Sequence, residues 1–95
     1  MVAHLKIQRK YLFFRKDAKE ILNHIFEKKK IPRNVYLDFS RVKFFSRSFI
    51  DELLNVISKL KEKEISVVIQ NLNPQLRIMM DRVQKTKAEI QRAIA

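Results

Sequence analysis

The sequence predicts a small α/β domain with a mainly parallel sheet, built in a βαβαβα order. Two observations carry this prediction. Short apolar runs suited to strands alternate with longer amphipathic segments suited to helices, and each connection is long enough for a crossover helix. The chain has 95 residues, of which 46% are hydrophobic, enough for one core, so we expect residues 1–95 to form a single domain.

The N-terminal part supplies the first predicted strand and helix. Leu5 and Ile7 alternate with polar neighbours and, with the apolar run at residues 11–14, predict one long or bent strand before residue 15. Asp17 and Glu20 have the spacing of a capping box, and apolar residues with helical spacing follow them. This pattern predicts an amphipathic helix, which a lysine run and a proline bring to an end.

Two further strands are predicted to lie inside the domain. Residues 35–39 form an apolar run that is interrupted only by Asp38, and we expect Val42 and Phe44 to extend or buttress this strand. Residues 65–69 form a second β-branched run. Both runs are typical of strands that are buried on both faces.

The other two helices are predicted from capping residues at their N-termini. Ser46 and Ser48 are expected to open the second helix, with Asp51 and Glu52 in its first turn, where carboxylates complement the helix dipole. Asn73-Pro74 supplies an N-cap followed by proline at the first helical position. We therefore expect a long helix at the C-terminus.

Absences in the composition exclude several classes of site. The chain has no cysteine, which excludes disulfides and thiolate metal sites and favours a cytoplasmic location. It has no glycine, so neither a P-loop nor a dinucleotide-binding loop can form. No apolar run is long enough for a secretory signal or a membrane span. The glycine-free composition, rich in Lys and Glu, is compatible with a heat-adapted source.

The charge is large and unevenly distributed. The formal net charge is +11, and residues 1–47 carry 13 basic and 4 acidic residues, whereas residues 48–95 carry 8 and 6. A basic half can attract nucleic acid, acidic protein surfaces or anionic membranes. The alternative is a solvated, lysine-rich surface that only aids solubility.

Candidate binding residues gather in the loops that follow the predicted strands, where parallel sheets usually meet their ligands. These loops, with the first turn of the last helix, present Arg15, Lys16, Ser40, Arg41, Ser46, Arg47, Ser48, Asn71, Asn73 and Arg77. The pattern favours binding of anionic groups near helix N-termini. The competing interpretation is that the serines and Asn73 only cap helices.

Catalytic groups are sparse in this sequence. His4 and His24 have no neighbouring carboxylate pair or thiol, so neither a triad nor a metal cluster is indicated. Asp38 is the one acid within an apolar strand, and we interpret it as a structural acid that accepts backbone N–H bonds from the following loop. We therefore expect a binding protein that is not an enzyme and has no cofactor and no metal.

Two segments resemble a known family. In residues 37–48, LDFSRVKFFSRS, a strand that ends in an acid, an apolar residue and a serine leads to serines that open a helix, which is similar to the STAS signature. Residues 67–77, VVIQNLNPQLR, are similar to the last core strand of STAS domains and the Ser/Asn-Pro helix start that follows it. The chain also resembles a STAS-like subgroup at Arg15, Phe49, Asp51, Glu52 and Leu53. The resemblance covers about residues 35–82 and implies a STAS-like fold.

The resemblance also implies a regulatory role. STAS-domain anti-sigma factor antagonists present this loop and helix to a kinase-like partner, which phosphorylates a serine there. In this chain the usual acceptor position holds Arg47, so Ser46 and Ser48 are the candidate phosphorylation sites. Added phosphate charge at a binding surface can release a partner or recruit an arginine.

Our first hypothesis is a non-enzymatic regulatory module that binds a protein partner through residues 40–54. Its expected contact residues are Ser40, Arg41, Ser46, Arg47, Ser48 and Asp51. The alternative is a nucleic-acid-binding domain that uses the basic half and stacks bases on aromatic residues. Its expected contacts are Arg15, Lys16, Lys28, Lys29, Lys30, Arg33, Arg41, Arg47 and Arg77, with Tyr11, Phe44 and Phe45 for stacking. A homodimer is expected if the small sheet leaves a face or an edge uncovered.

Overall fold

The computed structural model describes residues 2–27 and 30–94, and for residues 88–94 the backbone alone. Eight elements follow one another along the described chain: β1 (Val2–Lys6), β2 (Tyr11–Leu12), α1 (Arg15–Phe26), β3 (Asn34–Asp38), β4 (Phe44–Phe45), α2 (Arg47–Glu62), β5 (Ser66–Gln70) and α3 (Pro74–Ile94). The predicted alternation of strands and helices is therefore confirmed, and two short strands are added to it.

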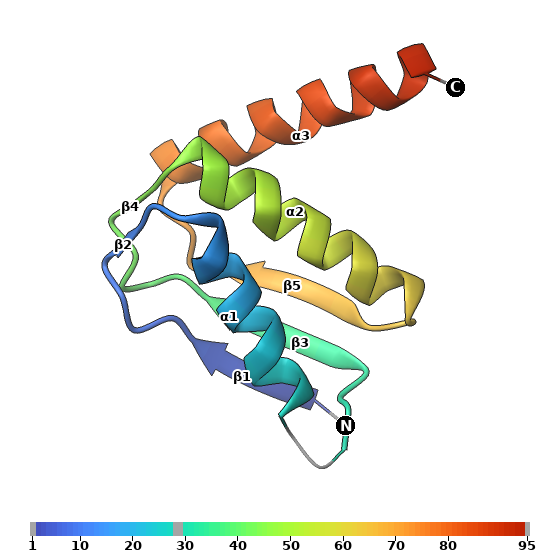
Figure 1. Cartoon of the computed structure of the whole chain (residues 1–95). Helices are drawn as coiled ribbons and strands as arrows, with labels where there is room; N and C mark the ends of the chain where they lie inside the picture. The colour runs from blue at the N-terminus through green and yellow to red at the C-terminus, as the bar shows by residue number, and fades with distance from the viewer. Residues whose placement is uncertain (1, 28–29, 95) are drawn as a thin grey trace.

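The main sheet is parallel and has the order β1-β3-β5. Figure 1 shows α1 and α2 side by side on one face of this sheet, as two crossovers of the same hand require. The core lies between these layers: Val35 and Leu37 of β3 face Ile25 of α1 and Leu53 of α2, and all four side chains are buried. The central strand is thus the most deeply buried one.

The N-terminal segment differs from the prediction of one long strand. β1 ends at Lys6, and the exposed polar residues 8–10 separate it from β2. β2 does not join the main sheet but pairs in parallel with β4, with Tyr11 opposite Phe44 and Leu12 opposite Phe45. Phe44 therefore does not extend β3, because its strand belongs to this second, two-stranded sheet.

The first turns of α1 and α2 differ from the predicted ones. Phe14 is the N-cap of α1, and Asp17 is the third helical residue, whose carboxylate accepts the Phe14 N–H over 3.1 Å. Asp17 is buried and is paired with Arg9. α2 begins at Arg47, so Asp51 and Glu52 lie in its second turn rather than in the predicted first.

The prediction that residues 65–69 form a strand buried on both faces is wrong, because none of the five side chains of β5 is buried. Val67 and Ile69 are half-buried against the helical layer, whereas Val68 is 41% exposed on the opposite face. In Figure 1, α1 and α2 both lie on one face of this sheet, and among the described strands β5 pairs with β3 alone. On the open face Tyr36 stacks on His4, with ring centroids 4.9 Å apart, and Val68 is its neighbour on β5.

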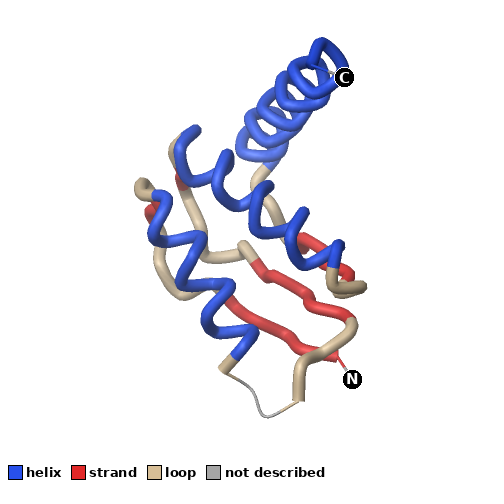
Figure 2. The backbone as a smooth tube through the Cα atoms, turned by 45° about the vertical axis from the view of Figure 1, so that its right-hand side comes forward, coloured by secondary structure: helices blue, strands red, loops and turns tan. Residues whose placement is uncertain are grey.

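The last helix starts as predicted and then leaves the body of the domain. The side chain of Asn73 accepts the N–H of Gln75 over 2.8 Å, as an N-cap does. Leu76, Met80 and Val83 are buried in the core cluster, and beyond them α3 extends away from the sheet (Figure 2). Within the described part of the chain, no helix has the length and apolarity needed to span a membrane.

Candidate functional site

The β2–β4 pair lies beyond the carboxyl ends of β1 and β3, beside the N-termini of α1 and α2 (Figure 1). Side chains alternate across this pair. Leu12 and Phe45 point inward and are 2% and 0% exposed, whereas Tyr11 and Phe44 point outward and are 49% and 39% exposed. The pair therefore closes this end of the core and presents aromatic side chains to solvent.

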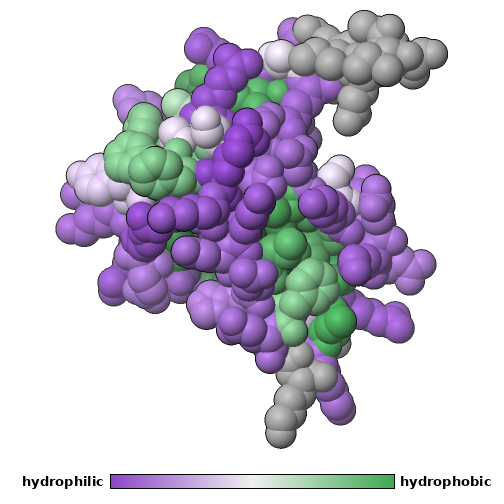
Figure 3. Space-filling model, in the orientation of Figure 1, coloured by the Kyte–Doolittle hydropathy of each residue, from purple (hydrophilic) through white to green (hydrophobic). Residues whose placement is uncertain are grey.

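Four aromatic residues form one exposed group, here called the aromatic cluster: Tyr11, Phe13, Phe14 and Phe44. The ring of Phe13 lies 6.1 Å from Tyr11, 6.4 Å from Phe14 and 5.7 Å from Phe44, measured between centroids. An apolar patch at this end of the molecule, surrounded by hydrophilic side chains, is visible at the upper left of Figure 3. Exposed apolar groups packed on one another, rather than scattered singly, are typical of a binding surface.

Basic residues lie on the chain segments next to the aromatic cluster. The ammonium group of Lys16 lies 5.5 Å from the centre of the Phe14 ring, within the range of a cation–π contact. Arg41 and Lys43 lie on the loop before β4, and Arg47 opens α2, and all three are exposed. The surface therefore combines apolar area with positive charge.

Ser46 fixes the local backbone. Its hydroxyl accepts the N–H of Phe49 over 3.1 Å, as the N-cap of α2, and donates to the carbonyl oxygen of Phe13 over 2.6 Å. Ser48 lies two residues further along the chain, as the second residue of α2, and is exposed. The two candidate phosphorylation sites thus differ, because Ser46 is engaged in the fold and Ser48 faces solvent.

Asp51 is the centre of an ion-pair network that joins the three helices. Its carboxylate accepts from Arg15 of α1 over 2.7 Å and lies 3.0 Å from the ammonium group of Lys87 on α3. Arg15 also lies 3.6 Å from Glu52. The bond from Arg15, and then that from Lys87, lowers the pKa of Asp51, and the same contact raises the pKa of Arg15.

Asp38 organises the loops at the carboxyl end of the sheet. Its Oδ1 accepts the backbone N–H of Ser40 over 2.8 Å and the side-chain amide of Asn71 over 3.1 Å. These bonds, the Asn71 bond first, lower the pKa of Asp38 because they favour the carboxylate. Asp38 therefore ties the loop after β3 to the loop after β5.

The family model of the STAS domain matches residues 7–92. The chain belongs to the STAS family. The STAS domain of a SulP transporter from Vibrio cholerae has the same fold, with a TM-score of 0.70 and 18% identity, over 92% of this chain and 66% of that one. No curated protein matches the sequence.

The STAS family includes anti-sigma factor antagonists and domains of SulP transporters. Its members are in general non-enzymatic modules that bind and regulate other proteins. In this STAS chain, no three His, Cys, Asp or Glu side chains of the described residues come close enough to hold a metal ion.

The predicted nucleic-acid contacts do not form one group in the STAS fold. Lys16 lies over the Phe14 ring, and Arg15, Arg41 and Arg47 belong to segments at the same end of the domain, beyond the carboxyl ends of the strands. Lys30 and Arg33 precede β3 and lie at the opposite end, and Arg77 is exposed on α3. Lys28 and Lys29 lie outside the described residues. Phe45 cannot stack on a base because it is fully buried.

Phe13 and Phe14 were not predicted to lie at the surface, because they stand in a run that resembles a strand. A signal was present in the sequence. Four bulky apolar residues at positions 11–14 directly precede a helix, and a strand can turn only alternate residues to one core. Part of that run had to face solvent.

Proposed function

We propose that the chain is a non-enzymatic regulatory module that binds a protein partner through the aromatic cluster and the adjoining start of α2. The observation that carries the proposal is the packing of four exposed aromatic rings on one another, with Lys16 over the Phe14 ring and with exposed Arg41 and Arg47 on the adjoining segments. Aromatic and arginine side chains dominate binding energy at protein interfaces. A partner surface that is apolar in its centre and acidic at its rim complements this arrangement.

Regulation at this surface would act through Ser48. The residue is exposed in the first turn of α2, where a phosphate is favoured by the helix dipole and by the neighbouring Arg47. The same phosphate would repel an acidic partner. Modification of Ser46 would break its bonds to Phe13 and Phe49, so we propose Ser48 as the acceptor.

The test uses a photo-crosslinking amino acid placed at Arg47 and, as a matched control, at Arg33, an exposed arginine at the opposite end of the sheet. Crosslinking in cells of the source organism should give one discrete protein adduct from position 47 and not from position 33. Substitution of Phe13 or Phe44 by alanine should abolish that adduct. Identical adducts from both positions, or an adduct that survives both substitutions, would contradict the proposal.

A nucleic-acid-binding function is the second candidate, because Tyr11 and Phe44 are exposed side by side on paired strands. Fluorescence anisotropy with single-stranded RNA and duplex DNA at about 50 and 200 mM salt separates the two functions. Under our proposal, binding is weak and disappears at the higher salt. Binding that persists there and is lost in Tyr11→Ala and Phe44→Ala would favour nucleic acid.

A further inference from the structure

The outer edge of β5 offers unpaired backbone groups. The N–H of Ser66 and the carbonyl oxygen of Gln70 bond to the β3 side of the sheet, over 2.8 and 3.0 Å. Because backbone groups alternate along a strand, the N–H and C=O groups of Val67 and Ile69 point to the outer side. Among the described residues, no strand pairs with β5 on that side.

This edge lacks the charges that usually protect an exposed strand. Natural edge strands commonly carry lysine, proline or a bulge that prevents pairing with another chain. Residues 65–76 contain no Lys, Arg, Asp or Glu, the longest such run in a chain that is 33% charged. The other edge strand, β1, carries Lys6 and is followed by Arg9 and Lys10. Two chains of charge +11 meet least repulsion at an uncharged segment.

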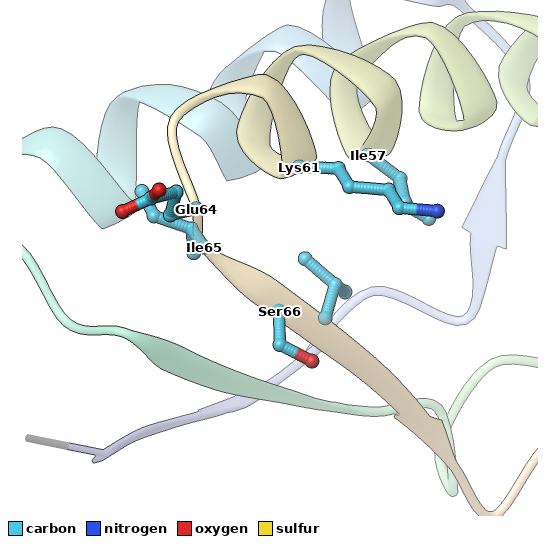
Figure 4. Close-up of a pocket in the computed structure, with 6 residues that line it drawn as sticks. Ile57, Lys61, Glu64, Ile65 and Ser66 are labelled. Atoms are coloured by element: carbon cyan, nitrogen blue, oxygen red, sulfur yellow. The ribbon is translucent and has the colours of Figure 1, made fainter.

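A hollow of about 490 Å³ lies beside this edge and is lined by Ile57, Lys61, Ile65 and Val67, together with Glu64 and Ser66. Figure 4 shows Ile57 and Lys61 projecting from α2 above the strand. α3 does not close this side, because it extends away from the sheet (Figure 2). An added strand therefore has room at the edge and apolar side chains to contact.

We propose that β5 pairs antiparallel with β5 of a second copy of this chain, so that two three-stranded sheets become one. Full overlap of the two five-residue strands centres the pair on Val68, so the outward-pointing groups of Val67 meet those of Ile69 of the partner subunit, and the two-fold axis repeats this pair. The two copies of Val68 then meet on the axis as a non-hydrogen-bonded pair, with Cα atoms about 4.5 Å apart. The proposal does not depend on the aromatic cluster.

The register is tested by Val68→Cys in a chain that has no other cysteine. The predicted separation of about 4.5 Å lies within the range of Cα distances in disulfides. The control is Val2→Cys on β1, because Val2 is 49% exposed and Val68 is 41% exposed. Under mild oxidation, V68C should become a disulfide-linked dimer much faster than V2C. Equal rates for the two variants would overturn the proposal, as expected if a different protein supplies the added strand.

Sedimentation equilibrium tests the unmodified chain. Dimerisation should strengthen between about 50 and 500 mM salt, because salt screens the repulsion between two chains of charge +11. Val68→Lys places two ammonium groups opposite each other and should raise the Kd about tenfold or more, whereas Val2→Lys adds the same charge elsewhere and should change it about twofold at most. Circular dichroism verifies that both variants fold. A wild-type chain that stays monomeric at every salt concentration would overturn the proposal.

Discussion

The hydroxyl of Ser46 and the carbonyl oxygen of Phe13 lie 2.6 Å apart in a hydrogen bond that joins the start of α2 to the segment carrying the aromatic cluster. The same hydroxyl accepts the N–H of Phe49. One short side chain therefore caps a helix and holds the backbone of the candidate binding surface. Removal of this hydroxyl should therefore weaken both the start of α2 and the backbone at Phe13.

Ser46→Ala should lower the free energy of unfolding by about 1 to 2 kcal/mol, because the N-cap acceptor and the donor to Phe13 are both lost. Urea unfolding monitored by circular dichroism measures the change. Ser48→Ala is the matched control, since Ser48 is exposed and should change stability by less than about 0.5 kcal/mol. Equal effects of the two substitutions would show that the Ser46 bonds contribute nothing.

Asp51→Asn should make the stability less dependent on pH. Because Arg15 and Lys87 lower the pKa of Asp51 below its ordinary value of 3.8, the carboxylate stabilises the folded chain above that pH. This contribution is lost as the pH falls through the lowered pKa of the folded state.

We expect D51N to be less stable than wild type by about 1 kcal/mol at pH 7, with the difference vanishing as the pH falls through the lowered pKa of Asp51. Urea titrations across this range measure it. Asp81→Asn, at an exposed position on α3, is the control. A D51N deficit that stays constant with pH would show that the loss comes from packing and not from ionisation.

Glu64→Gly should stabilise the chain. Glu64 follows the C-cap of α2 with φ of 63°, in the left-handed region that costs most residues about 1 to 2 kcal/mol and glycine almost nothing. After the greater chain entropy of glycine in the unfolded state is subtracted, a gain of about 0.5 to 1 kcal/mol is expected. Thermal and urea unfolding measure it. Glu62→Gly, within the last turn of α2, should instead destabilise.

Phe49→Ala should lower the free energy of unfolding much more than Phe14→Ala, because Phe49 lies in the core and Phe14 at the surface. Phe49 is fully buried and stacks on Phe45, so its truncation should cost about 3 to 5 kcal/mol. Phe14 is 58% exposed, and its truncation should cost less than about 1 kcal/mol. Urea unfolding compares the two variants. Similar losses would mean that the aromatic cluster supports the fold and is not a free surface.

The order of strands and helices could be predicted because each helix buries one regular stripe, and because α2 and α3 start after Ser46 and Asn73, which are suited to capping. Residues 8–10 show where this reasoning failed. They are polar and separate β1 from β2, yet the apolar residues on both sides resembled one strand. The choice of β4 as the partner of β2 depends on a contact distant in sequence, which periodicity does not encode.

Burial was hardest to predict for β5 and for the aromatic cluster. A β-branched run such as residues 65–69 has the same composition in a central strand and in an edge strand, and only the sheet order distinguishes them. The role of Asp51 was hidden for a related reason. Its partners Arg15 and Lys87 come from two other helices, and the sequence alone does not place them together.

The open face of the sheet also has an optical consequence. The chain contains two tyrosines and no tryptophan, so its intrinsic fluorescence arises from Tyr11 and Tyr36. Tyr11 belongs to the aromatic cluster, and Tyr36 stacks on His4 on the open face, beside Val68 in the neighbouring strand. Replacing either tyrosine by phenylalanine leaves a single native fluorophore on the other surface. Occupancy of the two surfaces can thus be followed separately without any attached dye.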